Sequence, residues 1–381
     1  MSSIDFPRIE FDSELVTTAF ALERMRGEIG VGTTPAPIYS ELHSLFQYLA
    51  SVISARIEGN RTTVLDAVLG AREAAAAPGG AADAVQEILN IQRAMGVVDQ
   101  LDPARPVTHA FVRRLHQLAV EGLVREGDSN PGSYRSVDVG IQGATHRPPS
   151  AYSAQVEMDA LLEFVNRVVP PHLQVVHVAI AHHRFLWIHP FRNGNGRVSR
   201  LLSYAMLGRH GFVSPIGLRA VSPTAVFGVA REDYYSRLSV ADDLSAAGTV
   251  QWCTFFLRGL LTDITRSRTL QDFAFVRQQL IEPALDRFVA SGLLSAQERS
   301  VLAFVFENST VKAGDLAHLI PGSASSRSQA IRALIDRGLL KPQKDGGRFY
   351  HLSLAPNDFT PFVVSRLDTL GFLPPLLKDE R

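Results

Sequence analysis

Apolar residues recur at every third or fourth position along most of the chain, which is the spacing of amphipathic helices. Ile38 to Asn60 follows this pattern and ends in Gly59-Asn60, a common helix stop. His172 to Ile188 is apolar on nearly every side, so we expect it to form the buried axis of a helical bundle. The same spacing predicts further helices at 85–98, 108–123, 152–169 and 198–212. The predicted fold class is therefore mostly α.

Two segments between these helices break the pattern. Residues 71–85 are rich in Ala and Gly and contain Pro78, which predicts a loop or short linker. Ser136 to Ile141 alternates polar with small or branched residues and is bounded by Gly and Pro. We expect a short β-hairpin or extended flap there.

The pattern changes again near the C-terminus. It predicts helices at 296–307, 312–320 and 325–338, followed by two short strands around an Asp345-Gly346-Gly347 turn. This order is typical of a winged helix-turn-helix domain. The predicted organisation is an N-terminal helical region (1–85), a helical core (86–290) and a winged helix-turn-helix domain with its tail (291–381).

Composition and charge narrow the functional classes. Lys+Arg and Asp+Glu both count 38, so the net charge gives no overall attraction to nucleic acid or membrane. Cys253 is the only cysteine, which excludes an intrachain disulfide and is typical of a reducing compartment such as the cytoplasm. The sequence has neither a signal-like start nor an apolar run long enough for a membrane helix. We expect a cytoplasmic protein without a membrane partner.

HPFRNGNGR, residues 189–197, concentrates the candidate chemistry. Gly194 and Gly196 permit a tight backbone and open into a helix, whose free N–H groups and dipole suit a phosphate. Arg197 and Arg200 are three residues apart, so both lie on one helix face and can hold further phosphate oxygens. His189 precedes this cradle, and imidazole is well suited to accept a proton near neutral pH.

Residues 189–200, HPFRNGNGRVSR, resemble the signature of the Fic family, His-Pro-Phe-x-(Asp/Glu)-Gly-Asn-Gly-Arg-x-x-Arg, at every fixed position but one. The resemblance extends over about 38–257. It implies a Fic helical bundle with a short β-hairpin flap, and protein adenylyltransferase activity. Such an enzyme transfers AMP from ATP to a Ser, Thr or Tyr hydroxyl of a target protein or of itself.

The resemblance also implies residue roles. His189 would be the general base. Gly194, Asn195 and Gly196 would form the anion hole, in which Asn195 adds a side-chain donor. Arg197 would hold the β-phosphate and Arg200 the γ-phosphate.

Two further segments are similar to family elements. YYSRLSVAD, 234–242, would place Tyr235 against the adenine, with Asp242 where the family has Asn. The flap at Ser136 to Ile141 would dock the target protein by strand-like pairing.

Asn193 is the departure from the signature, since the family has a Mg²⁺-binding carboxylate at this position. An amide oxygen can ligate Mg²⁺ but lacks the negative charge. We expect weaker Mg²⁺ binding and a slowed transferase.

SARIEGN, residues 54–60, is similar to another family element, (Ser/Thr)-x-x-x-Glu-(Gly/Asn). Ser54 and Glu58 are four residues apart and share one helix face. The resemblance implies that Glu58 pairs with Arg200 and obstructs productive γ-phosphate binding, so the helix at about 38–60 would be inhibitory. In some members the same Glu also supports removal of AMP, and the sequence leaves that deAMPylation activity open.

Other functions stay open at this point. A DNA-binding regulator is the main alternative, because the third helix and wing of the C-terminal domain carry six cationic residues: Arg327, Arg332, Arg337, Lys341, Lys344 and Arg348. Winged helices also bind proteins. Transfer of phosphate or UMP is a further alternative. The target protein and association into a homo-oligomer are not determined by the sequence.

Overall fold

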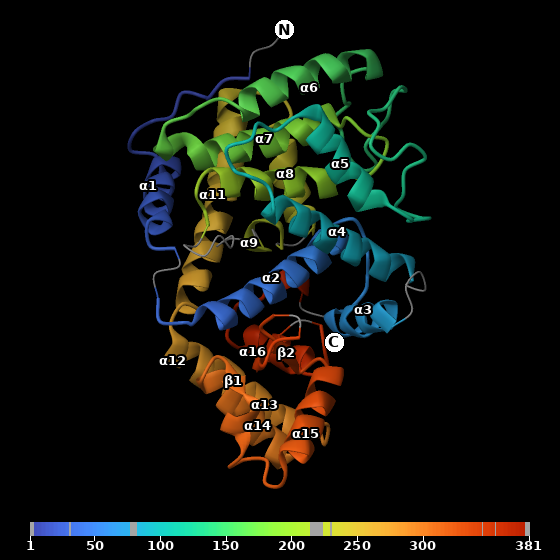
Figure 1. Ribbon diagram of the computed structural model, residues 1–381. Coiled ribbons are helices and arrows are strands. Elements are labelled where there is room, and N and C mark those ends of the chain that lie inside the picture. The colour runs from blue at the N-terminus through green and yellow to red at the C-terminus, as the bar shows by residue number, and fades with distance from the viewer. Residues whose placement is uncertain are drawn as a thin grey trace.

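The computed structural model describes residues 4–29, 32–76, 82–213, 224–228, 231–344, 346–354 and 356–377. Within these ranges the regular secondary structure is helical, apart from one small three-stranded sheet (Figure 1). The mostly α prediction is therefore confirmed. No helix in these ranges is long and apolar enough to span a bilayer.

The larger part of the molecule is a helical bundle built around α7. This helix packs against α6, α8 and α11, and most of its side chains are buried. Its bounds agree with the helix predicted from His172 to Ile188. The bundle consists of α4 (Asp83–Asp99), α5 (His109–Val120), α6 (Ala151–Val165), η1 (Pro171–Leu173), α7 (Gln174–Ile188), α8 (Asn195–Arg209), α9 (Thr224–Phe227), α10 (Arg231–Ser239) and α11 (Ala246–Thr269).

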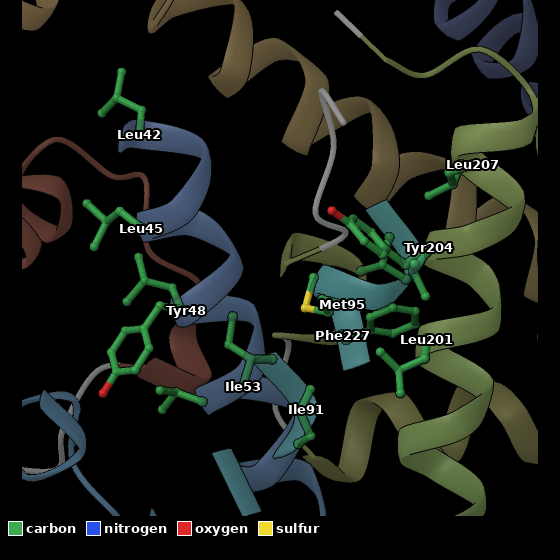
Figure 2. Packing of buried hydrophobic residues seen from close by; sticks show 14 of the residues in the cluster. Leu42, Leu45, Tyr48, Ile53, Ile91, Met95, Leu201, Tyr204, Leu207 and Phe227 are labelled. Carbon is green, nitrogen blue, oxygen red and sulfur yellow. The ribbon is translucent and has the colours of Figure 1, made fainter. Parts of the chain in front are cut away.

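Three N-terminal helices complete this region: α1 (Glu14–Arg26), α2 (Ala36–Ile57) and α3 (Val64–Ala76). The long helix α2 lies between the bundle and the C-terminal segment (Figure 1). Figure 2 shows Ile53 of α2 beside Ile91 of α4, whereas Leu42, Leu45 and Tyr48 lie on the side of α2 next to the C-terminal ribbon. Both faces of α2 are therefore buried, which fits its long apolar pattern.

The C-terminal segment contains short helices and the sheet. Its elements are α12 (Phe273–Phe275), the π-helical turn η2 (Val276–Ile281), α13 (Glu282–Ala290), α14 (Ala296–Glu307), β1 (Val311–Lys312), η3 (Ala313–Leu316), α15 (Ala324–Asp336), β2 (Leu340–Pro342), β3 (Phe349–Leu352), α16 (Thr360–Thr369) and η4 (Pro375–Leu377). The strand order is β1-β3-β2 and both pairings are antiparallel. Val311 pairs with Tyr350, and Leu340 pairs with Leu352.

Three local predictions need correction. Residues 136–141 form no strand, because Val137 is 47% exposed and the alternation has no buried face. The helix predicted at 312–320 is only the 3₁₀ turn η3, since Pro321 and Gly322 follow closely and favour turns. Residues 71–76 of the predicted linker belong to α3, and 77–81 lie outside the described residues.

The predicted strands lie where expected, as β2 and β3. The turn between them includes Asp345, which is outside the described residues.

Candidate active site

The loop from α7 to α8 has a backbone that few residues adopt. His189 caps the C-terminus of α7 in the left-handed region, with φ of 51°, and Gly194 caps the N-terminus of α8 with φ of 75°. A Cβ at Gly194 would lie 2.9 Å from Cγ1 of Val120. Glycine is therefore favoured at this position both by the left-handed backbone and by the lack of space for a side chain. This loop brings the imidazole and the start of α8 together.

The side chain of Asn195 stabilises this loop from inside. Its Oδ1 accepts the N–H of Phe191, and its Nδ2 donates to the carbonyl of Phe191, each at 2.9 Å. Asn195 is 2% exposed. Because both ends of the amide are engaged, the predicted side-chain donor to phosphate does not face the helix opening in this structure. The backbone N–H of Asn195 keeps its predicted place at that opening.

His189 has the protonation state of a base. Its Nδ1 donates to the carbonyl of Leu186 at 3.3 Å, so the lone pair of Nε2 is the basic position. Burial lowers the pKa of His189 to about 4; the nearby charge of Glu58 raises this pKa, while that of Arg135 lowers it. The imidazole is therefore neutral at physiological pH, which is the form that can accept a proton.

His116 of α5 supports the same loop. Its ring stacks on Phe191 with centroids 3.8 Å apart and planes at 3°. Nε2 donates to the carbonyl of Asn193 at 3.1 Å, and Nδ1 accepts the N–H of Gly132 at 2.9 Å. Burial lowers the pKa of His116 to about 4. A neutral imidazole with a defined tautomer thus fixes the loop.

Ser54 and Glu58 both contact Arg200, as the shared helix face predicts. Nε of Arg200 donates to Oγ of Ser54 at 2.8 Å, and Nη2 donates to Oε1 of Glu58 at 2.6 Å. Nη2 also donates to the backbone carbonyl of Ser54 at 3.0 Å. Arg200 is 5% exposed, so the ion pair is largely shielded from water.

The carboxylate of Glu58 lies against the first turn of α8. A Cβ placed on Gly196 would overlap Oε1 of Glu58. Burial by itself raises the pKa of Glu58, but the charges of Arg200 and Arg197 and the hydrogen bond from Arg200 outweigh it, so its pKa lies below the usual value. An ionised carboxylate therefore occupies the positive end of α8.

Arg197 is completely buried, and its guanidinium pairs with a carboxylate of α4. Its Nη1 lies 3.2 Å from Oε1 of Glu87, and its Nη2 donates to the carbonyl of Glu126 at 2.7 Å. Asn60, just after Glu58, donates to the other oxygen of Glu87 at 2.9 Å. The buried arginine is neutralised inside the protein, and its contact with a β-phosphate stays a prediction.

Asn193 is held by its own loop and by 126–127. Its Oδ1 accepts the N–H of Gly194 at 2.7 Å, and its Nδ2 lies 3.5 Å from Oε2 of Glu126. The described residues contain no group of three His, Cys, Asp or Glu side chains that could hold a metal. Glu126 is the carboxylate beside Asn193, but it faces the amide N–H₂ group, while the amide oxygen accepts from Gly194, so Mg²⁺ binding by Asn193 stays a prediction.

Tyr235 lies on α10, within reach of the charge of Glu58. It is 38% exposed, and its ring centroid is 5.6 Å from the guanidinium carbon of Arg231. Burial and then the charge of Glu58 raise its pKa. Asp242, at the predicted family position, accepts from Nε2 of His183 at 3.1 Å. An adenine contact for Tyr235 stays a prediction.

Sequence comparison shows what the region of the site resembles. A model of the Fic/DOC family matches residues 106–207. The matched stretch, which is similar to the domains of that family, is called the Fic domain from here on. The Fic domain thus contains α5 to most of α8, including His116, Arg135 and the loop of His189, whereas Ser54 and Glu58 lie before it.

Curated relatives match a segment of 195 residues. The chain is 28% identical over 195 residues to "Protein adenylyltransferase Fic" of Nematostella vectensis and 29% identical over 195 residues to the protein of that name in Drosophila willistoni. Each match covers 50% of this chain but only 42% and 36% of those relatives. The matched segment is therefore less than half of either relative.

Solved structures show the same fold over a larger share of the chain. A crystal structure of a Fic family protein from Desulfovibrio desulfuricans G20 covers 92% of this chain and 98% of its own, with a TM-score of 0.54 and 20% identity. The structure of Fic-1 (aa134 - 508) from C. elegans covers 66% of this chain and 71% of its own, with a TM-score of 0.52 and 18% identity. At these identities the likeness concerns the fold alone.

Three buried polar residues of the site were not predicted from the sequence: His116, Glu87 and Arg135. Each lies in a stretch without an obvious motif, and each acts through backbone or charge contacts with residues distant along the chain. For two of them the sequence does contain a signal of a special role: His116 and Glu87 each place a polar side chain on the otherwise apolar face of a helix. Arg135 offered no such signal.

Proposed function

We propose that this protein is a protein adenylyltransferase that transfers AMP from ATP to a hydroxyl of a target protein and of itself. One observation carries the proposal: a neutral imidazole and the N-terminus of a helix lie on one loop, and an internal carboxylate occupies that helix end through Gly196 and Arg200. A site that accepts a carboxylate there is suited to a phosphate. The curated relatives named protein adenylyltransferase support the same activity.

The chemistry follows from this arrangement. Nε2 of His189 accepts the proton of the target hydroxyl, and the hydroxyl oxygen attacks the α-phosphorus of ATP. The bond from that phosphorus to the bridging oxygen breaks, and pyrophosphate leaves. The general base contributes about 10²- to 10⁴-fold to the rate. The N–H groups at Gly194 to Gly196 stabilise charge on the phosphates.

Glu58 would be the brake on this reaction. Its carboxylate repels a phosphate at the opening of α8 and engages Nη2 of Arg200. Nη1 of Arg200 is buried without a hydrogen-bond partner among the described residues, so a donor is available beside the helix opening. Removal of Glu58 also frees Nη2 of Arg200, which then becomes a second donor for the γ-phosphate. The N-terminal helix α2 is therefore proposed to be inhibitory.

Mg²⁺ accompanies ATP and supplies charge neutralisation of the phosphates. Asn193 would contribute its amide oxygen, and Glu126 the nearest carboxylate. Because the amide carries no charge, we propose weak metal binding and slow transfer. Tyr235 is proposed to contact the adenine, and the segment Ser136 to Ile141 to dock the target protein.

The proposal is tested by intact mass spectrometry after incubation with ATP and Mg²⁺. We expect AMP adducts on Glu58→Gly and on Glu58→Gln, which keeps the side-chain size but removes the charge. Fewer adducts are expected on the wild type, because its carboxylate competes with phosphate. The double variant Glu58→Gly/His189→Ala is expected to carry none. Adducts that persist without His189 would contradict its role as the base.

Labelled nucleotides distinguish the transferred group. ATP labelled at the α-phosphate should label the protein, whereas ATP labelled at the γ-phosphate should not. Incorporation from the γ-phosphate would establish phosphate transfer, and preferential use of UTP would establish UMP transfer. Loss of AMP from modified protein in the wild type but not in Glu58→Gln would add deAMPylation by the same carboxylate.

We further propose that the C-terminal segment is a winged helix module with a protein partner. The support is the order of α14, β1, η3, α15, β2 and β3 in one antiparallel sheet. Three of the six cations expected to contact DNA pair with carboxylates of this chain: Arg337 with Glu298 at 2.8 Å, Arg332 with Asp336 at 3.3 Å and Lys341 with Glu41 at 3.4 Å. This reduces the cationic face that DNA binding would need.

A further inference from the structure

Arg135 is a buried cation whose partners are almost all backbone carbonyls. It is 4% exposed, and its guanidinium donates to the carbonyls of His189 at 2.8 Å and Val137 at 3.2 Å. It also donates to the carbonyls of Pro149 and Ile188. The backbone N–H of Arg135 donates to the carbonyl of Pro190 at 2.9 Å. One residue thus contacts two separate backbone segments.

Burial of the Arg135 guanidinium costs free energy, because the charge loses its contacts with water. Its contacts within the protein must therefore compensate for this loss. The carboxylate in range is Asp138, whose Oδ1 lies 3.8 Å away and whose side chain is 78% exposed, so the pair is weak. The compensation comes from the C-terminus of α7, where unpaired carbonyls carry a partial negative charge. The planar fork of arginine spreads its donors over three nitrogens, so it reaches oxygens that are further apart than an ammonium group can reach.

The two segments are the catalytic loop and the flap; with the residues that follow Ile141 up to the start of α6, the flap spans 136–149. Ile188 and His189 end α7 on one side of the guanidinium, while Val137 and Pro149 are the two ends of the flap on the other. His189 has a left-handed backbone, a conformation that needs support from its surroundings. His146 within the flap donates to the carbonyl of Trp187 at 2.8 Å and fastens the flap to the same helix end.

We propose that Arg135 is a positioning residue that fixes His189 relative to both ends of the flap, and so sets the imidazole against the acceptor hydroxyl. This inference rests on the proposed function, in which the flap carries the target. A hydroxyl delivered by the flap meets Nε2 only when flap and catalytic loop keep one relative position. A displacement of about 1 Å in such a contact costs on the order of 10²-fold in rate.

The test is Arg135→Lys in the Glu58→Gly background. Lysine keeps the charge, but its three N–H donors all lie on one nitrogen, so it spans carbonyls of two segments less well than the fork of arginine. We expect kcat for AMP transfer to fall by about 10- to 100-fold, with little change in the Kd for a non-hydrolysable ATP analogue. The control is Arg209→Lys, since Arg209 also donates to backbone and amide oxygens, at Pro103 and Asn166, away from the flap.

The outcomes separate positioning from folding. A fall in kcat at a melting temperature and ATP-analogue Kd like those of Arg209→Lys supports the proposal. An unchanged kcat, or a loss explained by weaker ATP binding, overturns it. If the lysine variant does not fold, Arg135→Gln is used with the same criteria, because an uncharged side chain is less costly to bury.

A second measurement does not depend on catalysis. Hydrogen exchange of the amides of 136–149 is compared between wild type and Arg135→Lys. Faster exchange confined to this segment and to the end of α7 supports the clamp, and equal exchange overturns it. If Glu58→Gly transfers no AMP, the proposed function fails, and the exchange result alone decides the structural part of the inference.

Discussion

His116 shows how one buried side chain makes stability depend on pH. Burial lowers its pKa from 6.5 to about 4 in the folded chain, whereas in the unfolded chain it titrates near 6.5. Between these values the unfolded state binds more protons, so the stability conferred at neutral pH is lost as the pH falls. The loss is up to about 1.4 kcal/mol per pH unit for one such group.

We predict that His116→Gln makes the stability less dependent on pH. Glutamine keeps a donor and an acceptor near Asn193 and Gly132 but does not titrate. From pH 7 to pH 5, the wild type should lose about 2 kcal/mol more of unfolding free energy than the variant, as measured by urea denaturation at both pH values. Equal losses in the two proteins would show that the imidazole is not held neutral.

At the scale of one element, α2 holds the two side chains of the proposed brake, Ser54 and Glu58, one helical turn apart. Ser54 accepts from Nε of Arg200, and Glu58 accepts from Nη2, so the serine fixes the orientation in which the guanidinium meets the carboxylate. Ser51 lies on the same helix and is equally buried, but its hydroxyl donates to the carbonyl of Gln47 within α2. The two serines differ mainly in their relation to Arg200.

We predict that Ser54→Ala partly releases the brake. Nε of Arg200 loses its acceptor, which costs about 1–3 kcal/mol for a buried donor and loosens the ion pair with Glu58. Incorporation of labelled AMP should rise above the wild-type level but stay below that of Glu58→Gly. Ser51→Ala should leave incorporation at the wild-type level. Equal incorporation in both serine variants would argue against a role of Ser54 in the brake.

At the scale of the whole molecule, α2 joins the site to the C-terminal segment. Glu41, near its first turns, is 6% exposed and accepts the N–H of Leu354 at 2.7 Å. Nε2 of His351 and Nζ of Lys341 lie 3.3 and 3.4 Å from its Oε1. Burial raises the pKa of Glu41, but these partners outweigh it and lower the pKa below the usual value. The other end of the same helix carries Glu58.

We predict that Glu41→Ala weakens the docking of β2 and β3 on α2. The N–H of Leu354 loses its acceptor in a buried position, which costs about 1–3 kcal/mol of unfolding free energy. Hydrogen exchange at 340–354 should become faster. Glu14→Ala is the control, because Glu14 pairs with Arg258 on the surface, where both side chains are at least half exposed. A stability loss no larger than that of Glu14→Ala would contradict this role of Glu41.

The sequence by itself determined the local features of the site. An imidazole, a helix opening and a cation lie close together because they are close along the chain, at His189, Gly194 to Gly196 and Arg200. The four-residue spacing of Ser54 and Glu58 fixes a shared helix face, because a turn has 3.6 residues. Helix spacing likewise predicted α2, α7 and α14 within two or three residues at each end.

Only the tertiary structure decided which way the buried charges face. Arg197 and Arg200 share a helix turn, yet one pairs with Glu87 of α4 and the other with Glu58 of α2. Val137 and Pro149 converge on Arg135 through carbonyl groups, which every residue possesses and which therefore leave no pattern in the side chains. Local spacing encodes helices and faces, whereas the pairing of buried charges depends on which helices pack together. That choice is made by the whole core.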